Sequence, residues 1–268
     1  MKVLKYDVIA GGIKLYESDL DLEQTLDCGQ AFRWEKTDEN TFEGAYLNFP
    51  LKVSQNGNEF IFHNISEDEF LNIWVEYFDL YTDYAALKNR YCEDEMMKKA
   101  CSYAQGIRIL KQDSFEALIS FIFSQNNNIK RIKGIIKRLC EHYGGFPTAE
   151  DLAACEVEDL EFLRSGFRAK YVIDAARKVL SGEIDLEKIK ALDYDTASLE
   201  LQKIKGVGPK VADCVLLFGM YKIEAFPKDV WIKRAMAEYY PQGLPQCILG
   251  TQGIAQQYLF HYIRNNAE

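Results

Sequence analysis

In the first quarter of the chain, short segments rich in hydrophobic residues alternate with short polar stretches. The segments FRWEK, TFEGAYL, LKVSQ and EFIFHN are rich in β-branched and aromatic residues, and short polar stretches containing DEN, NFP and NGN separate them. The Asn56-Gly57 pair lies between two of these segments and is a strong signal for a two-residue hairpin. The pattern therefore predicts a small antiparallel sheet within residues 3–63.

Helical spacing replaces this alternation from about Ser66. Ser66 and Glu69 have the spacing of a capping box, and Phe70, Ile73, Trp74 and Tyr77 then recur as one helical face. The same kind of pattern predicts later helices at 114–125, 129–144, 148–155, 156–164, 168–181, 185–192, 195–205, 209–221 and 251–265. The expected fold class is α+β: a small N-terminal antiparallel β domain with flanking helices, residues 1–104, packed on a mainly α-helical domain, residues 105–268.

A glycine-containing break separates two of the predicted helices. Gly206 and Gly208 allow positive φ and close backbone approach, and Pro209 suits the first position of the helix that follows. The arrangement, spanning about 195–221, is a helix–hairpin–helix. Because a helix start presents its backbone N–H groups outward, this hairpin suits a phosphate.

Lys210 falls in the first turn of the second helix of this hairpin. The positive end of the helix dipole disfavours an ammonium group there and favours the neutral, nucleophilic amine. A solvated lysine or a phosphate contact is the alternative interpretation. Cys214 lies one turn further on the same face, and Asp229 follows a proline turn as the N-cap of another helix. Asp229 is therefore either a structural cap or an electrostatic partner for a nucleophile.

The chain of 268 residues carries a formal net charge of −9, which argues against a nucleic-acid-binding protein. The acidity is concentrated in residues 1–104, which hold 10 Lys and Arg against 20 Asp and Glu. Residues 105–268 are nearly balanced, and their basic residues cluster in three segments, at 130–138, 164–170 and 203–210. These clusters could form a positive face, although charged helix faces are more often simply solvated.

The seven cysteines are scattered and form no CxxC pair, which predicts reduced thiols, no metal site and no iron–sulfur cluster. No apolar run approaches the length of a membrane span, and the N-terminus lacks a signal-peptide core. We therefore expect a cytoplasmic protein, associated with the nucleoid in a prokaryote, that does not contact a membrane.

The run GVGPKVADC followed by FPKDV resembles the signature of base-excision DNA glycosylases that combine a helix–hairpin–helix, a Gly/Pro-rich loop and an aspartate. Within that superfamily it is similar to the lysine-bearing 8-oxoguanine DNA glycosylases. The resemblance implies that Lys210 is the nucleophile and that Asp229 stabilises the charge developing on the sugar. It covers nearly the whole chain.

Four further positions resemble the family's base-binding residues. In CGQAFRW, the resemblance implies that the Gly29 carbonyl accepts the N7–H of 8-oxoguanine, which guanine lacks. In AQQYLF, it implies that Gln256 reads the Watson–Crick edge while Phe260 stacks on the base, and Cys214 belongs to the same set. The alternatives are an ordinary turn before a strand at Gly29, and a core aromatic beside a surface amide in AQQYLF.

Other segments resemble the family's contacts with the DNA around the flipped base. The resemblance implies that Asn126 fills the gap left by that base and that Arg131 and Arg168 hold the orphaned cytosine. Phe167 stands at a wedge position that is commonly tyrosine, and Trp231 stands where many relatives carry histidine. Gly206 and Gly208 complete the expected DNA contacts.

Together these observations predict a bifunctional DNA glycosylase and AP lyase that flips and excises 8-oxoguanine opposite cytosine. The expected partner is duplex DNA containing 8-oxoguanine, bound by a monomer without a cofactor. One alternative is a monofunctional alkylpurine glycosylase of the same fold, which needs the aspartate but not Lys210. The other is a non-catalytic helix–hairpin–helix DNA-binding module.

Overall fold

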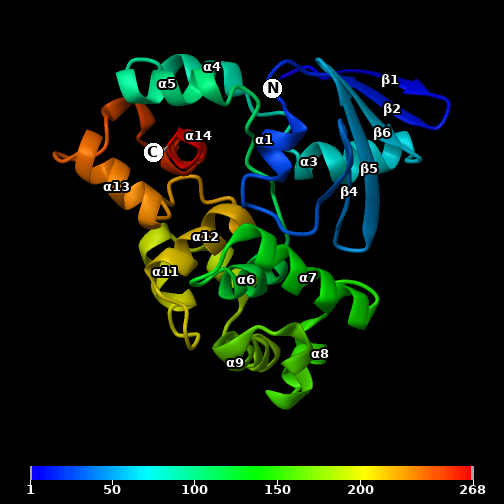
Figure 1. Ribbon diagram of the computed structural model, residues 1–268, viewed down its shortest axis with the longest axis vertical. Coiled ribbons are helices and arrows are strands. Elements are labelled where there is room, and N and C mark those ends of the chain that lie inside the picture. The colour runs from blue at the N-terminus through cyan, green and yellow to red at the C-terminus, as the bar shows by residue number, and fades with distance from the viewer. Residues whose placement is uncertain (1, 267–268) are drawn as a thin grey trace. The chain divides into compact units, whose positions relative to one another are not determined.

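The computed structural model describes residues 2–266, which form two compact units (Figure 1). The sheet unit combines the segment up to Lys111 with the segment from Lys228 onward, and the hairpin unit comprises Gln112–Pro227. The C-terminal segment thus packs with the N-terminal one, whereas the sequence division placed it in the domain 105–268. That division into sequence domains stays a prediction. No helix formed by residues 2–266 is long and apolar enough to cross a membrane.

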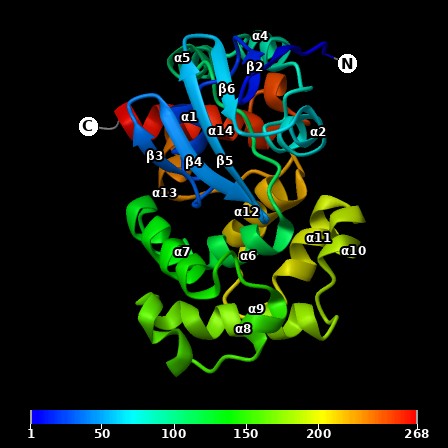
Figure 2. The ribbon, with the colours of Figure 1, turned by 90° about the vertical axis from the view of Figure 1, so that its right-hand side faces the viewer.

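The sheet unit contains a six-stranded antiparallel sheet in the order β1-β2-β6-β5-β4-β3 (Figure 2). Its strands are β1 Lys5–Ile9, β2 Gly12–Tyr16, β3 Glu35–Asp38, β4 Thr41–Tyr46, β5 Phe49–Asn56 and β6 Glu59–His63. The predicted hairpin pairs Asn56 with Glu59, and Gly57 has φ +59°. Phe60 and Phe62 are fully buried, while their neighbours on β6 are half-exposed.

The first helical segment differs from the predicted regular helix. It comprises α2 Glu67–Glu69, a π-helix η1 Phe70–Trp74 and α3 Val75–Tyr77. Half of the predicted capping box is present, since the Ser66 hydroxyl accepts the backbone N–H of Glu69 at 3.1 Å. The Glu69 carboxylate instead accepts the indole N–H of Trp74 at 3.0 Å, so it does not close the box.

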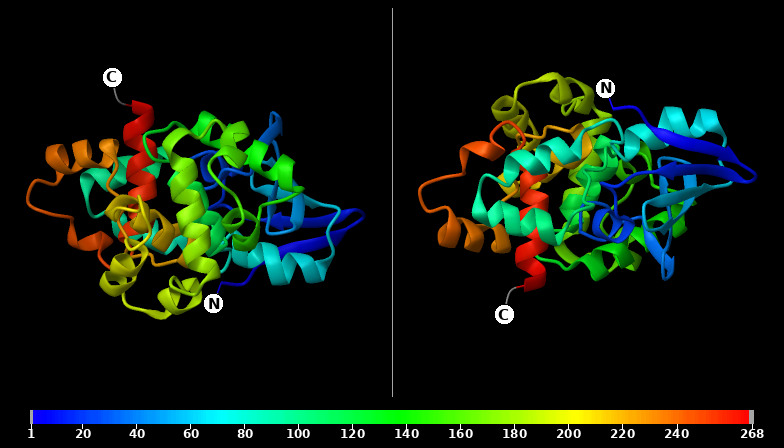
Figure 3. Two further views of the ribbon diagram at one scale, coloured as in Figure 1. Left: turned by 90° about the horizontal axis from the view of Figure 1, so that it is seen from below. Right: turned by 90° about the horizontal axis from the view of Figure 1, so that it is seen from above.

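The remaining helices of the sheet unit are α1 Leu22–Leu26, α4 Tyr84–Tyr91, α5 Glu95–Tyr103, α13 Val230–Tyr239, η4 Gln246–Ile248 and α14 Gln252–Asn266. Figure 3 shows α14 beside α13 and α5 from two sides, and these two helices are its main helical neighbours. The hydroxyl of Tyr258 on α14 donates to the Ile107 carbonyl at 2.9 Å. The buried face of α14 is thereby fixed to the segment that leaves α5.

The hairpin unit is entirely helical apart from its loops. It contains α6 Ser114–Phe123, α7 Ile129–Tyr143, α8 Ala149–Ala153, η2 Glu158–Leu163, η3 Gly166–Arg168, α9 Ala169–Leu180, α10 Leu186–Ala191, α11 Tyr194–Leu201 and α12 Pro209–Met220. These elements confirm the predicted helices, except that the segment predicted at 156–164 is a 3-10 helix. The fold class predicted from the sequence is confirmed.

The apolar helix α6 packs directly on α12. Phe121 and Phe218 stack with ring centroids 5.3 Å apart. A Cβ added to Gly219 would lie 2.8 Å from the Ala117 Cβ, which is closer than carbon atoms approach in proteins. The Ser114 hydroxyl donates to the Gly219 carbonyl at 2.8 Å. Close packing therefore requires glycine at position 219 and sets the position of α12 against α6.

Substituting Gly219→Ala should lower the free energy of unfolding by about 1–3 kcal/mol, because the added methyl overpacks the contact with Ala117. Gly134→Ala is the matched control, since a Cβ at this position on α7 meets only the end of the Arg138 side chain, at 3.5 Å. The control should gain about 0.5–1 kcal/mol from helix propensity. Urea unfolding of both variants measures the difference, and equal stabilities would contradict the packing argument.

Candidate active site

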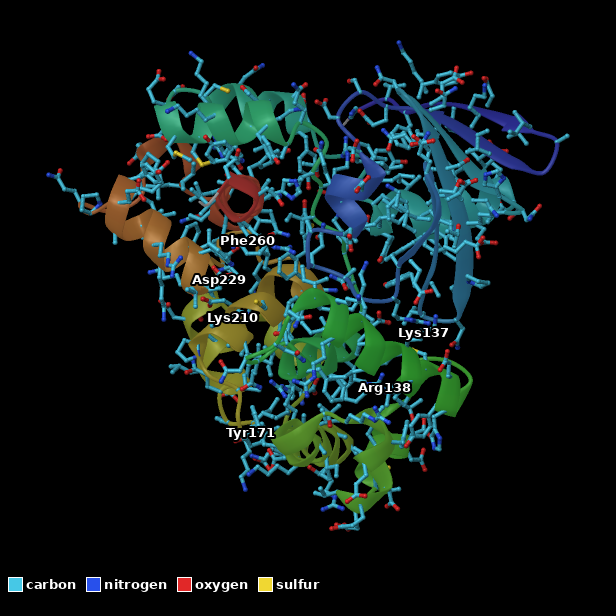
Figure 4. The ribbon with its side chains drawn as sticks, viewed as in Figure 1. Lys137, Arg138, Tyr171, Lys210, Asp229 and Phe260 are labelled. Atoms are coloured by element: carbon cyan, nitrogen blue, oxygen red, sulfur yellow. The ribbon has the colours of Figure 1, made fainter. Side chains whose placement is uncertain are left out.

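The hairpin between α11 and α12 is built around Gly206. Its φ is +84°, and a Cβ there would lie 2.4 Å from the ring of Tyr171 on α9 (Figure 4). Gly208 differs from the prediction, because its φ is −99° and its ψ −179°, an extended conformation open to any residue. A Cβ on Gly208 would meet nothing within 4 Å. The fold itself therefore requires glycine at 206 but leaves the space beside 208 open.

Lys210 occupies the second position of α12, after Pro209. Its Nζ lies 3.5 Å from the Ser124 hydroxyl oxygen and 5.7 Å from the centre of the Phe121 ring. Both partners belong to the C-terminal end of α6, and the Ser124 hydroxyl donates to the Phe121 carbonyl at 2.8 Å. The Ser124 oxygen is thus free to accept from the lysine amine. The packing of α6 on α12 thereby fixes where this amine lies.

Cys214 lies one turn after Lys210 and is 3% exposed. This placement agrees with the shared helical face predicted from the spacing. The polar contact of Lys210 on α6, Ser124, lies 86 residues away in the chain, and no pattern in the sequence pointed to it.

A short loop follows α6, and we call residues 125–128 the wedge loop. Asn126 is exposed and has φ +45°, a conformation uncommon outside glycine. Asn128 caps α7, since its side chain accepts the backbone N–H of Arg131 at 2.9 Å. The asparagines therefore end one helix and begin the next, as predicted, and they present Asn126 to solvent.

Arg168 holds the wedge loop from the other side. It is 3% exposed, and its Nε donates to the Gln125 carbonyl at 2.8 Å while Nη2 donates to the Asn126 carbonyl at 2.9 Å. Nη2 also contacts the Gln125 carbonyl, and Nη1 donates to the Ser165 carbonyl at 3.1 Å. Burial, and then the nearby charge of Arg131, lowers the pKa of Arg168. Its main structural role in this conformation is to fix the loop.

Phe167 and Arg131 lie at the same edge of the hairpin unit. Phe167 is 47% exposed, and the Arg168 guanidinium carbon lies 4.5 Å from its ring centre. Nη2 of Arg131 donates to the Arg164 carbonyl at 3.1 Å. The structure thus brings together Asn126, Arg131, Phe167 and Arg168, four of the seven positions for which the family resemblance implies contacts with DNA.

In the sheet unit, Gly29 belongs to a tightly held turn that we call the recognition turn, residues 28–30. Its φ of +92° favours glycine. The neighbouring Gln30 is fully buried: its amide nitrogen donates to the carbonyls of Thr25 at 2.9 Å and Arg108 at 2.7 Å, and its oxygen accepts the Leu110 N–H at 2.9 Å. One buried amide therefore fixes the backbone of the turn.

Gln256 and Phe260 lie one turn apart on α14. Gln256 is 4% exposed, and its Oε1 has no hydrogen-bond partner among residues 2–266. A buried polar atom without a partner costs about 1–3 kcal/mol. Such a cost is expected where a ligand supplies the missing donor. Phe260 is half-exposed, and the guanidinium carbon of Arg264 lies 5.9 Å from its ring centre.

Asp229 begins α13, as predicted. Its Oδ1 accepts the backbone N–H of Ile232 at 2.8 Å, whereas Oδ2 accepts no hydrogen bond from the part of the chain that the structure describes. Two residues after Asp229, the centre of the Trp231 ring lies 5.4 Å from the guanidinium carbon of Arg234. Trp231 and Arg234 line a hollow of about 410 Å³ between α13 and α14. Asp229 thus combines a structural cap with one available carboxylate oxygen.

Comparison with known proteins places these features in a class. Residues 119–243 match the model of the HhH-GPD superfamily of base excision DNA repair proteins, and residues 12–118 match the N-terminal domain of 8-oxoguanine DNA glycosylase. An N-glycosylase/DNA lyase of Saccharomyces cerevisiae is 31% identical over 266 residues, covering 86% of this chain and 71% of that protein. The chain belongs to the 8-oxoguanine DNA glycosylase family, as its motifs predicted.

Solved structures agree with this assignment over the full length. The 8-oxoguanine glycosylase/lyase of Clostridium acetobutylicum, in complex with duplex DNA containing cytosine opposite 8-oxoguanine, is 37% identical with a TM-score of 0.91, covering 100% of this chain and 99% of that one. MBOgg1 in complex with a low-affinity DNA ligand is also 37% identical, with a TM-score of 0.93 and full coverage of both chains.

The two hairpin glycines make a paired test. Gly206→Ser should lower the free energy of unfolding by about 1–3 kcal/mol, because the side chain meets Tyr171 and a positive φ. Gly208→Ser should keep or slightly raise stability, since serine is a favourable N-cap and the space is open. Urea unfolding measures both. A similar loss in both variants would show that the hairpin needs glycine twice.

Proposed function

We propose that this chain excises 8-oxoguanine opposite cytosine from duplex DNA and then cleaves the strand as an AP lyase. The observation that supports this most is the placement of Lys210: its amine lies at the start of α12, beside the hairpin and against Ser124. The family assignment supports the same DNA glycosylase and lyase chemistry. The protein acts on DNA as a monomer in the cytoplasm in this proposal.

The Lys210 amine attacks C1′ of the flipped nucleotide, and the bond from C1′ to the base nitrogen breaks; the base takes the electron pair of that bond and the proton that the amine nitrogen gives up. The free Oδ2 of Asp229 stabilises the positive charge that develops on the sugar. The bond from C1′ to the ring oxygen then breaks, this oxygen takes up a proton from water, and a protonated Schiff base forms between Lys210 and C1′. Loss of a C2′ proton breaks the bond from C3′ to the 3′ phosphate oxygen, which is β-elimination.

Base recognition is assigned to the sheet unit. The Gly29 carbonyl accepts the N7–H of 8-oxoguanine; guanine presents a lone pair there, which would leave two acceptors facing each other. The unpartnered Oε1 of Gln256 accepts from the Watson–Crick edge, and Phe260 stacks on the ring. The family resemblance also assigns base binding to Cys214, which belongs to the hairpin unit. Flipping costs a few kcal/mol, which these contacts offset.

The wedge loop and its neighbours are assigned to the opposite strand. Asn126 fills the gap left by the flipped base, Phe167 stacks at the kink, and Arg131 donates to the orphaned cytosine. A guanidinium has five N–H donors, and the four carbonyl contacts of Arg168 leave one N–H on Nη1 for the base. The preference for cytosine is therefore weaker than two free arginines would give. Gly206, Gly208 and Trp231 contact the DNA backbone.

The two alternatives fit less well. A monofunctional alkylpurine glycosylase has no use for an amine positioned as Lys210 is. A non-catalytic DNA-binding module would give no reason for the buried, unpartnered Oε1 of Gln256.

Lys210→Gln should abolish the covalent adduct that borohydride traps between the protein and an 8-oxoguanine duplex, because no amine remains to form the Schiff base. Duplex binding should persist. Denaturing gels measure the adduct, and Lys222→Gln, a lysine beyond the other end of α12, is the matched control. An adduct of equal yield with Lys210→Gln would remove Lys210 from the mechanism.

Asp229→Asn should lower the rate of base excision by about 10²–10³-fold, because it removes the charge that stabilises the sugar cation. Affinity for the damaged duplex and protein stability should change little, since asparagine caps helices nearly as well as aspartate. Single-turnover kinetics with the 8-oxoguanine duplex measure the rate. An unchanged rate would leave Asp229 with the capping role alone.

A further inference from the structure

Cys28 lies directly before Gly29, and its sulfur contacts three other residues. Its thiol is 1% exposed and donates to the Thr25 carbonyl at 3.4 Å. Its sulfur also accepts from the Gln257 amide, with Nε2 at 3.4 Å, and lies 3.5 Å from Gln30 Nε2, whose two N–H groups point mainly to the Thr25 and Arg108 carbonyls. Burial raises the pKa of this thiol to about 11, so it keeps its proton and its donor role at neutral pH. Cys28 thus links the recognition turn to Thr25 on one side and to Gln257 on the other.

Gln257 connects the recognition turn to α14. It is 3% exposed and contacts Cys28 across 229 residues of sequence. The residue before it is Gln256, whose buried Oε1 has no partner among the described residues. The contact between Cys28 and Gln257 therefore lies between the turn that presents the Gly29 carbonyl and the helix that presents the Gln256 amide.

We propose that Cys28 and Gln257 are positioning residues that set the Gly29 carbonyl relative to the Gln256 amide, and so determine the selectivity for 8-oxoguanine over guanine. This inference rests on the proposed function. Neither side chain needs to touch the base. Their role is to hold the Gly29 carbonyl and the Gln256 amide, which contact the base.

The selectivity depends on position because the two bases differ near Gly29 by one N–H. A single carbonyl distinguishes them only if it lies within hydrogen-bonding distance and direction of that N–H when Gln256 holds the other edge. Hydrogen bonds weaken steeply when donor and acceptor are misaligned. Groups that recognise a ligand must be held within about 0.5 Å of the productive geometry, and contacts with neighbouring side chains hold them there. Loss of the Cys28–Gln257 contact should therefore reduce discrimination more than overall binding.

The test compares affinities of a duplex with 8-oxoguanine opposite cytosine and the same duplex with guanine, in the non-cleaving Lys210→Gln background. Cys28→Ala and Gln257→Met should each lower the affinity ratio by about three- to tenfold, the worth of one modest hydrogen bond. Cys28→Ser should restore the ratio, because a hydroxyl keeps both the donor and the acceptor. Cys101→Ala is the matched control, since it removes an equally buried sulfur from α5. It should leave the ratio unchanged.

A second measurement separates positioning from general damage. With Lys210 present, each variant is assayed for cleavage of a duplex carrying a preformed abasic site, which offers no base to recognise. Cleavage should stay within about twofold of the parent, because the lysine chemistry is intact. An unchanged affinity ratio in Cys28→Ala and Gln257→Met would overturn the inference, as would an equal loss in abasic cleavage. A parent that cleaves abasic DNA without preferring 8-oxoguanine would overturn the proposed substrate itself.

Discussion

The contact between α6 and α12 is the constraint on which the rest of the hairpin unit depends. Ala117 fills the space that a side chain at position 219 would need, so only glycine fits there. Phe121 stacks on Phe218 at the same interface. With the two helices this close, the start of α12 lies against the end of α6, where Ser124 contacts Lys210. The position of the proposed nucleophile is therefore a consequence of hydrophobic packing rather than of a local polar motif.

A second constraint acts at the recognition turn of the sheet unit, where buried amides add hydrogen bonds to the packing of the hydrophobic core. Gln30 satisfies three backbone groups around the recognition turn, and Gln257 contacts Cys28. Buried polar groups that are fully bonded specify one arrangement, because any other leaves donors or acceptors unpaired. Oε1 of Gln256 is one of the buried polar atoms without a partner among the described residues, and it is the one at which the proposed function places the base.

The sequence predicted much of this structure because its signals are local. Asn56-Gly57 fixed the hairpin, the glycine break located the start of α12, and Asp229 was recognised as an N-cap from its place before a helical pattern. The capping box at Ser66 failed because Glu69 bonds to Trp74 instead, a choice that depends on packing. Gly208 was expected to share the positive φ of Gly206, and only the backbone geometry distinguishes them.

The contacts that sequence reasoning could not find are those between distant segments. Ser124 and Lys210 lie 86 residues apart, and Cys28 and Gln257 lie 229 apart, so no spacing rule relates them. The carbonyl contacts of Arg168 are similar, since they join η3 to the wedge loop. Such contacts decide how site residues are held, whereas the motifs decide only which residues they are.

The central claim is that one amine, that of Lys210, forms the covalent link to DNA. Peptide mapping by mass spectrometry of the borohydride-reduced adduct tests it directly, because reduction leaves the sugar remnant attached to the reacting nitrogen. The account predicts the remnant on the peptide that contains Lys210. A remnant on the N-terminal amine or on another lysine, such as Lys222 or Lys228, would contradict it.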